Sequence, residues 1–113
     1  MTMIKIHLCP DNLRRETFTT PDLSSFARDN FPLYTQTNWF TLPQVGDEAA
    51  EEAFDLSQNP SRDEERESVY RNHRPVCVGD VVQCLHRDRS RQFFLCNPIG
   101  WTQIDLTFAE RSV

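Results

Sequence analysis

Hydrophobic and polar residues alternate along the start of the chain, from Met3 to Cys9. One side of this pattern carries Ile4, Ile6 and Leu8, and the other carries Met3, Lys5, His7 and Cys9. A period of two is typical of a β-strand, because successive side chains of a strand point to opposite faces. The pattern therefore predicts a strand over residues 3–9 that is buried on its isoleucine side, followed by a turn or loop over residues 10–15.

A short helix is predicted after this loop. Thr20-Pro21-Asp22 offers an N-cap, a proline at the first helical position and an acid in the first turn. The apolar side of this helix carries Leu23, Phe26 and Ala27. Because the residue before a proline avoids the helical conformation, Pro32 ends the helix after roughly two turns.

The middle of the chain predicts a strand, a second helix and a loop. Residues 33–42 hold three aromatic residues among threonines, a composition that favours a strand. Asp47 then caps a helix from Glu48 to about Ser57, with glutamates in its first turn. The apolar side of that helix carries Ala49, Ala50, Ala53, Phe54 and Leu56. Asn59-Pro60 ends it, and the charged run over residues 61–67 has no periodicity, which predicts a loop.

The last third of the chain predicts a compact β unit. Two strands, Val81–Leu85 and Gln92–Cys96, flank a hairpin loop at His86–Ser90, and a turn at 97–100 leads to a strand over 101–104. Four residues are predicted to have structural roles in the turns and core, Gly79, Asp80, Gly100 and Trp101, with Trp101 buried. Leu106 and Phe108 are expected to close over the core.

Together these elements predict an α+β fold: a small, mainly antiparallel sheet, two short helices and a C-terminal three-strand β meander. The chain has 113 residues, 38% of them hydrophobic, which suits one domain. Within it we distinguish an N-terminal strand and helix over about residues 3–30, an acidic helix and loop over about 47–68, and the β unit over about 74–106. Phe93 and Phe94 are adjacent and must point to opposite faces, so helices or a partner must cover both faces.

Part of this pattern resembles the small YodL-like proteins that phages, plasmids and other mobile elements carry. The matching pieces are Ala53-Phe54-Asp55-Leu56-Ser57-Gln58-Asn59-Pro60, then Arg74, then Val78-Gly79-Asp80-Val81-Val82, and finally Gly100-Trp101. The match covers less than half of the chain, and Pro75 and Cys77 stand where that family tends to have serine. The resemblance implies a small α+β domain encoded on mobile DNA, and it implies no catalytic residues.

Charge is spread unevenly along the chain, whose net charge is −5. Residues 47–67 hold nine acids and two bases, a net charge of −7, whereas residues 71–91 hold five arginines and two acids. The acidic segment suggests a surface that mimics DNA phosphates and binds a basic protein. Its candidate contact residues are Glu48, Glu51, Glu52, Asp55, Glu64 and Glu65. The plainer interpretation is a solvated surface whose acids favour the helix N-terminus.

A nucleic-acid-binding surface is the first alternative. It would use Arg87, Arg89 and Arg91 of the hairpin, together with Arg71 and Arg74. Stacking groups would be Phe93, Phe94 and Trp101, although we expect these aromatics in the core. The negative net charge argues against this alternative, because long-range repulsion acts on the whole chain.

A zinc or thiol enzyme is the second alternative. The pairs His7/Cys9 and Cys84/His86 would have to converge on one tetrahedral metal, and Cys77 would pair with His73 as a nucleophile. The cysteines lack the close spacing of structural zinc sites and are more typical of buried thiols. We therefore expect no metal, no cofactor and no catalytic activity.

The pattern as a whole favours a cytoplasmic, non-catalytic protein-interaction module of a mobile or accessory gene. No apolar run approaches the roughly 20 residues of a membrane helix, and the first residues lack the pattern of a signal peptide. Its partner is expected to be a protein that the sequence does not identify, with nucleic acid as the less favoured ligand and no role for a membrane. Self-association into a homo-oligomer stays open.

Overall fold

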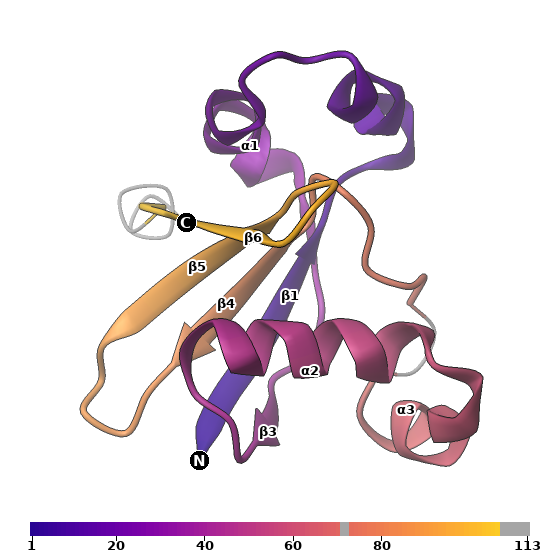
Figure 1. The fold of residues 1–113 in the computed structure, drawn as a ribbon, viewed down its shortest axis with the longest axis vertical. Coiled ribbons are helices and arrows are strands. Elements are labelled where there is room, and N and C mark those ends of the chain that lie inside the picture. The colour runs from indigo at the N-terminus through magenta and orange to yellow at the C-terminus, as the bar shows by residue number, and fades with distance from the viewer. Residues whose placement is uncertain (71–72, 107–113) are drawn as a thin grey trace.

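The computed structural model describes residues 1–70 and 73–106. It confirms the α+β class and contains one six-stranded sheet in which every strand pairing is antiparallel. The main order of strands is β2-β1-β4-β5-β6, and β3 also pairs with β1 (Figure 1). Strand β1 (Thr2–Leu8) is therefore central: it joins β4 (Val81–Leu85) on one side to β2 (Thr35–Gln36) and β3 (Phe40–Leu42) on the other.

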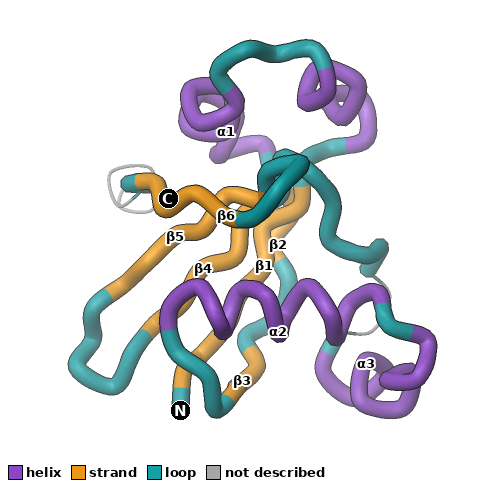
Figure 2. Tube along the Cα trace, viewed as in Figure 1, coloured by secondary structure: helices purple, strands orange, loops and turns teal. Residues whose placement is uncertain are grey.

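One face of the sheet packs against helix α2 (Gly46–Gln58), as Figure 2 shows. Ile4 and Ile6 of β1 and Phe94 of β5 (Arg91–Cys96) lie in this core with the alanines of α2. The predicted apolar side of α2 is confirmed, since Ala49, Ala50, Ala53 and Leu56 are buried. The small alanine side chains let the helix approach the sheet closely.

The isoleucine side of β1 is buried, as predicted, but the second face is not fully exposed: it is covered toward the end of the strand, where His7 and Cys9 are buried, whereas Met3 is exposed. A second core gathers α1 (Leu23–Asn30), the neighbouring 3-10 helix Phe31–Leu33 and Phe93 of β5. His7 is buried there: its ring lies 4.6 Å from that of Phe31 and its Nε2 lies 2.8 Å from Oε1 of Gln83. Phe93 and Phe94 thus lie on opposite faces, each beneath helices.

The predicted three-strand meander is confirmed as β4, β5 and β6 (Trp101–Ile104). Gly79 precedes β4 with φ +94°, and Gly100 precedes β6 with φ +76°, a backbone region that favours glycine. Leu106 is buried, as expected, whereas Phe108 lies outside the described residues. Trp101 is only half-buried, which corrects the prediction of full burial, because it lies on an edge strand.

Three local predictions are also corrected. The 10–15 loop is part of a 3-10 helix, Asp11–Phe18. The cap of α1 is Asp22 rather than Thr20, since the Asp22 carboxylate accepts a hydrogen bond from the Ser25 N–H at 3.1 Å. The single strand expected over 33–42 is two short strands. Between them the Thr37 hydroxyl, rather than a backbone carbonyl, accepts the hydrogen bond of the Ile6 N–H at 3.0 Å.

The largest correction concerns residues 61–67, which form helical structure instead of a loop. A 3-10 helix, Pro60–Arg62, leads directly into α3 (Asp63–Val69). Asn59 starts the turn, because its side-chain oxygen accepts a hydrogen bond from the Ser61 N–H at 3.0 Å. At the far end, Tyr70 is buried in the core beneath α2 and anchors the helix.

Candidate protein-binding surface

Helix α2 separates its apolar side from a row of acids. Asp47 and Glu48 lie in its first turn, where negative charge interacts favourably with the partial positive charge of the helix N-terminus. Asp47 does not cap the helix as predicted: the cap position is Val45, without a side-chain hydrogen bond. Helical spacing of three and four residues then brings Glu48, Glu51, Glu52 and Asp55 onto neighbouring positions of the outer surface.

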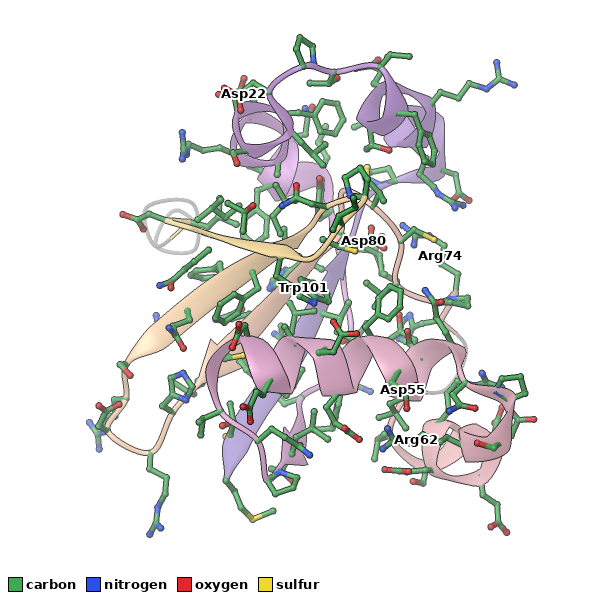
Figure 3. All side chains as sticks on the ribbon, in the orientation of Figure 1. Asp22, Asp55, Arg62, Arg74, Asp80 and Trp101 are labelled. Atoms are coloured by element: carbon green, nitrogen blue, oxygen red, sulfur yellow. The ribbon has the colours of Figure 1, made fainter. Side chains whose placement is uncertain are left out.

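Arg62 gathers the carboxylates of two helices around one guanidinium (Figure 3). Two of its nitrogens donate to the two oxygens of Glu65, at 2.9 and 2.7 Å. Its Nη1 also donates to Asp55 at 2.9 Å and forms an ion pair with Glu52. These contacts join α2 to α3, and the hydrogen bonds from Arg62 lower the pKa of Glu65.

Helix α3 adds further acids to the same surface. Asp63 pairs with Arg66, whose Nη1 lies 3.5 Å from the carbonyl oxygen of Ser57 in α2. Glu64 and Glu67 are exposed. We call residues 46–69 the acidic α2–α3 unit; it holds the nine acids and two arginines found in the sequence.

The structure therefore brings some of the predicted contact residues together and leaves others apart. Glu52, Asp55 and Glu65 meet at Arg62. Glu51 instead accepts a hydrogen bond from the indole N–H of Trp101 at 2.8 Å, a contact across 50 positions that no local pattern signals. Glu48 and Glu64 are exposed on α2 and α3.

The hairpin arginines form a separate and smaller surface. Arg87 and Arg89 are exposed in the loop between β4 and β5, and Arg91 is exposed at the start of β5. Two of the three stacking groups proposed for this alternative, Phe93 and Phe94, are buried in the two cores, whereas Trp101 is half-buried on the edge strand β6. Arg71 lies outside the described residues.

Arg74 is engaged in a buried ion pair with Asp80 that the sequence did not predict (Figure 3). Two Arg74 nitrogens donate to the two Asp80 oxygens at 2.6 and 2.8 Å, and the backbone N–H groups of Cys9 and Cys77 donate at 2.7 Å each. Burial opposes the charge of Arg74, but the hydrogen bonds and charge of Asp80 outweigh it and raise the pKa of Arg74. Asp80 thus holds the end of β1 against the start of β4.

The residues of the metal alternative do not converge. Cys84 faces the core beneath α2, whereas His7 and Cys9 lie in the core on the other side of the sheet. His86 lies beside Gln92, with Nε2 and Oε1 2.6 Å apart. Within residues 1–70 and 73–106, no group of three or more histidine, cysteine or acidic side chains has the arrangement of a metal site.

The thiol alternative loses its proposed partners. The Sγ of Cys77 accepts a hydrogen bond from Arg14 at 3.4 Å, whereas the His73 ring packs on Tyr70 at 5.4 Å. The other three thiols are buried. Burial raises the pKa of both Cys84 and Cys96 to about 12, so these two thiols stay protonated and weakly nucleophilic at neutral pH.

Among the described residues, no helix combines the length and the apolar character that crossing a membrane requires. In comparisons with known proteins, no family model matches this chain, and neither a curated protein nor a solved structure gives a match.

Proposed function

We propose that this chain is a non-catalytic protein-interaction module that binds a basic partner protein through its acidic α2–α3 unit. The observation that supports this proposal is the ordered arrangement of the acids: a net charge of −7 lies on two helices that Arg62 joins. A negative surface of this kind attracts positively charged proteins and speeds their association.

Order within the unit favours binding. Like charges on neighbouring turns repel one another, and Arg62 offsets this repulsion where α2 and α3 meet. Because the helices are already formed, a partner does not have to order a loop when it binds, which lowers the entropic cost of association. Glu48 of α2 and Glu64 of α3 stay exposed beside this cluster of paired charges in the sequence.

The resemblance to YodL-like proteins of mobile elements stays a prediction, and it favours one kind of partner. A mobile element gains from blocking a host protein that binds DNA, and such proteins carry basic surfaces. We therefore propose that the acidic unit occupies a DNA-binding surface of its partner, with its carboxylates in the place of phosphates.

Matched charge variants test this proposal. The double variant Glu48→Gln/Glu64→Gln removes two exposed charges from the acidic unit, and Glu16→Gln/Asp29→Asn removes two exposed charges elsewhere. Each protein is immobilised and used to capture proteins from a bacterial lysate, and the dissociation constant of a captured protein is then measured at two salt concentrations. We expect the first variant to weaken binding about three- to tenfold and the second to leave it nearly unchanged.

Two outcomes would contradict the proposal. Equal binding by both double variants would show that the acidic unit is solvated surface and not the binding site. Capture of nucleic acid that is lost in Arg87→Gln/Arg89→Gln would instead support the hairpin alternative.

A further inference from the structure

A small hollow opens where the acidic face of α2 meets the turn before β6. Phe54 of α2 and Trp101 of β6 form two of its walls, with ring centroids 6.1 Å apart and planes at 86°. Glu51 of α2, the buried Cys96, and Asn97, Pro98 and Gly100 of the turn complete the lining. The elements are brought together by the hydrogen bond from the Trp101 indole N–H to Glu51 Oε2 at 2.8 Å.

The size of the hollow limits what it holds. Its volume is about 180 Å³. A water molecule takes roughly 30 Å³ of liquid volume, so the space corresponds to roughly six waters. Pockets for drug-sized molecules measure about 300–1,000 Å³. The hollow therefore suits the end of one side chain better than a complete cofactor or metabolite.

The lining selects the charge of that side chain. Among the described residues that line the hollow, Glu51 is the only Asp, Glu, Lys, Arg or His. The thiol of Cys96 contributes no negative charge at neutral pH, because burial raises its pKa to about 12. The faces of aromatic rings attract cations, and a carboxylate at the rim adds a charge-assisted hydrogen bond.

We propose that this hollow receives an arginine or lysine side chain of the basic partner protein. The cation would lie against Trp101 and Phe54 and donate to Glu51, whose neighbours one turn away on α2 are Glu48 and Asp55. The inference rests on the proposed function, since it names the group by which that partner is anchored. A single buried cationic side chain among weaker charge contacts is typical of an interface hot spot.

A peptide titration tests the hollow without the unidentified partner. The probe is the blocked pentapeptide acetyl-Gly-Gly-Arg-Gly-Gly-amide, its control carries neutral citrulline in place of arginine, and a third peptide carries lysine. Binding is followed by NMR through the indole N–H signals of the two tryptophans, Trp39 and Trp101. We expect the arginine and lysine peptides to shift the Trp101 signal, with a dissociation constant on the order of 10 mM or tighter. The citrulline peptide should leave it in place.

Two variants separate the contribution of the Glu51 charge from that of the Phe54 ring. Glu51→Gln removes the charge but keeps an oxygen that accepts the Trp101 hydrogen bond, and it should weaken the arginine peptide about three- to tenfold. Phe54→Leu keeps an apolar side chain but removes a ring, with an expected loss of about twofold or more. The NMR spectrum of each variant shows whether the fold is kept, and Trp39 serves as an internal control.

Equal shifts with the arginine and citrulline peptides would overturn the inference, as would an unmoved Trp101 signal with both cationic peptides. These results are separable from the proposed function. The double variant Glu48→Gln/Glu64→Gln leaves every residue that lines the hollow intact. If that variant lost partner binding and the peptide titration failed, the acidic surface would still be supported as the binding surface. The hollow would then not be its anchoring site.

Discussion

Arg74 and Arg62 each hold carboxylates, but the surroundings of the two arginines differ. The Asp80 side chain beside Arg74 is 0% exposed, and four N–H groups donate to its two oxygens. The three carboxylates beside Arg62 are between 29% and 50% exposed. The Asp80 carboxylate makes its hydrogen bonds within the fold, whereas the carboxylates around Arg62 keep oxygens that face solvent.

The two sites also differ in how far apart along the sequence their contacting residues lie. Asp80 bonds to the backbone of Cys9, 71 positions away, so the Arg74 pair joins the end of β1 to the start of β4. Arg62 contacts residues no more than ten positions away, all within the acidic α2–α3 unit. A saturated, buried carboxylate whose hydrogen bonds link distant strands indicates a structural role. The exposed, local cluster around Arg62 leaves carboxylate oxygens open to solvent, as the proposed binding surface requires.

Replacement of the buried carboxylate should have the largest effect. In Asp80→Asn, Arg74 loses its counter-charge, and the new amide group cannot accept hydrogen bonds at both positions. Breaking a buried ion pair by removing one partner costs about 3–5 kcal/mol. We therefore expect chemical denaturation to show a decrease of that size in the free energy of unfolding.

A double-mutant cycle with Arg74→Met supplies the control. If the two side chains stabilise the fold through each other, the double variant should lose clearly less than the sum of the two single losses. A loss of less than about 1 kcal/mol in Asp80→Asn would place this pair with the exposed clusters and remove the contrast between the two arginines.

The sequence predicted those parts of the fold in which each segment carries its own signal. Alternation marked β1, the glycines marked the turns before β4 and β6, and the alanine pattern marked α2. The run 61–67 was predicted as a loop because its charges show no periodicity. Its helical state depends on the local Asn59 cap, and on Arg62 and the buried Tyr70, whose contacts with α2 and the core lie outside the run.

The contacts of the candidate site were less predictable, because they too depend on residues that are distant in the sequence. The acidic residues were visible as a cluster of charge, but their division between Arg62 and Trp101 was not. Trp101 and Glu51 are 50 positions apart, and no periodicity connects them. Burial of His7 likewise depends on Phe31, which reaches the second face of the sheet through the fold of the 10–33 region.

A substitution at Gly79, in the turn before Asp80, should have the second largest effect on stability. A Cβ added to Gly79 would lie 2.6 Å from Cγ2 of Thr17, at a φ of +94°. Gly100 provides a matched control, because its φ is +76° but nothing lies within 4 Å of its added Cβ. We expect Gly79→Ala to cost about 2–4 kcal/mol, the sum of backbone strain and overpacking. Gly100→Ala should cost about 1–2 kcal/mol from strain alone.

Thr17→Ser removes the methyl group that the new Cβ would meet while it keeps the hydroxyl that donates to the Arg14 carbonyl at 2.6 Å. Added to Gly79→Ala, it should recover much of the loss that exceeds the loss in Gly100→Ala, since only the Cβ of residue 17 then stays close, at 3.1 Å. Equal losses at the two glycines, with no recovery, would show that contact with Thr17 does not constrain this turn.

The smallest effect is expected at Arg62, and its dependence on salt and pH is more informative than its size. Arg62→Met leaves three carboxylates without their shared cation, but these side chains are partly exposed to solvent. We expect a loss of about 1 kcal/mol or less, which shrinks as added salt screens the repulsion among the carboxylates.

Lowering the pH should also reduce the difference in stability between wild type and Arg62→Met. Arg62 lowers the pKa of Glu65 below its ordinary value of 4.5, so folded wild-type protein keeps this group ionised when the unfolded chain has begun to bind protons. That contribution is present above about pH 4.5 and is lost as the pH falls through the lowered pKa. Unfolding measured from pH 7 to pH 3 should therefore bring wild type and Arg62→Met together at the acid end. If the loss were instead as large as in Asp80→Asn and insensitive to both salt and pH, Arg62 would belong to the framework of the fold, and the carboxylates around it would no longer be free to bind a partner.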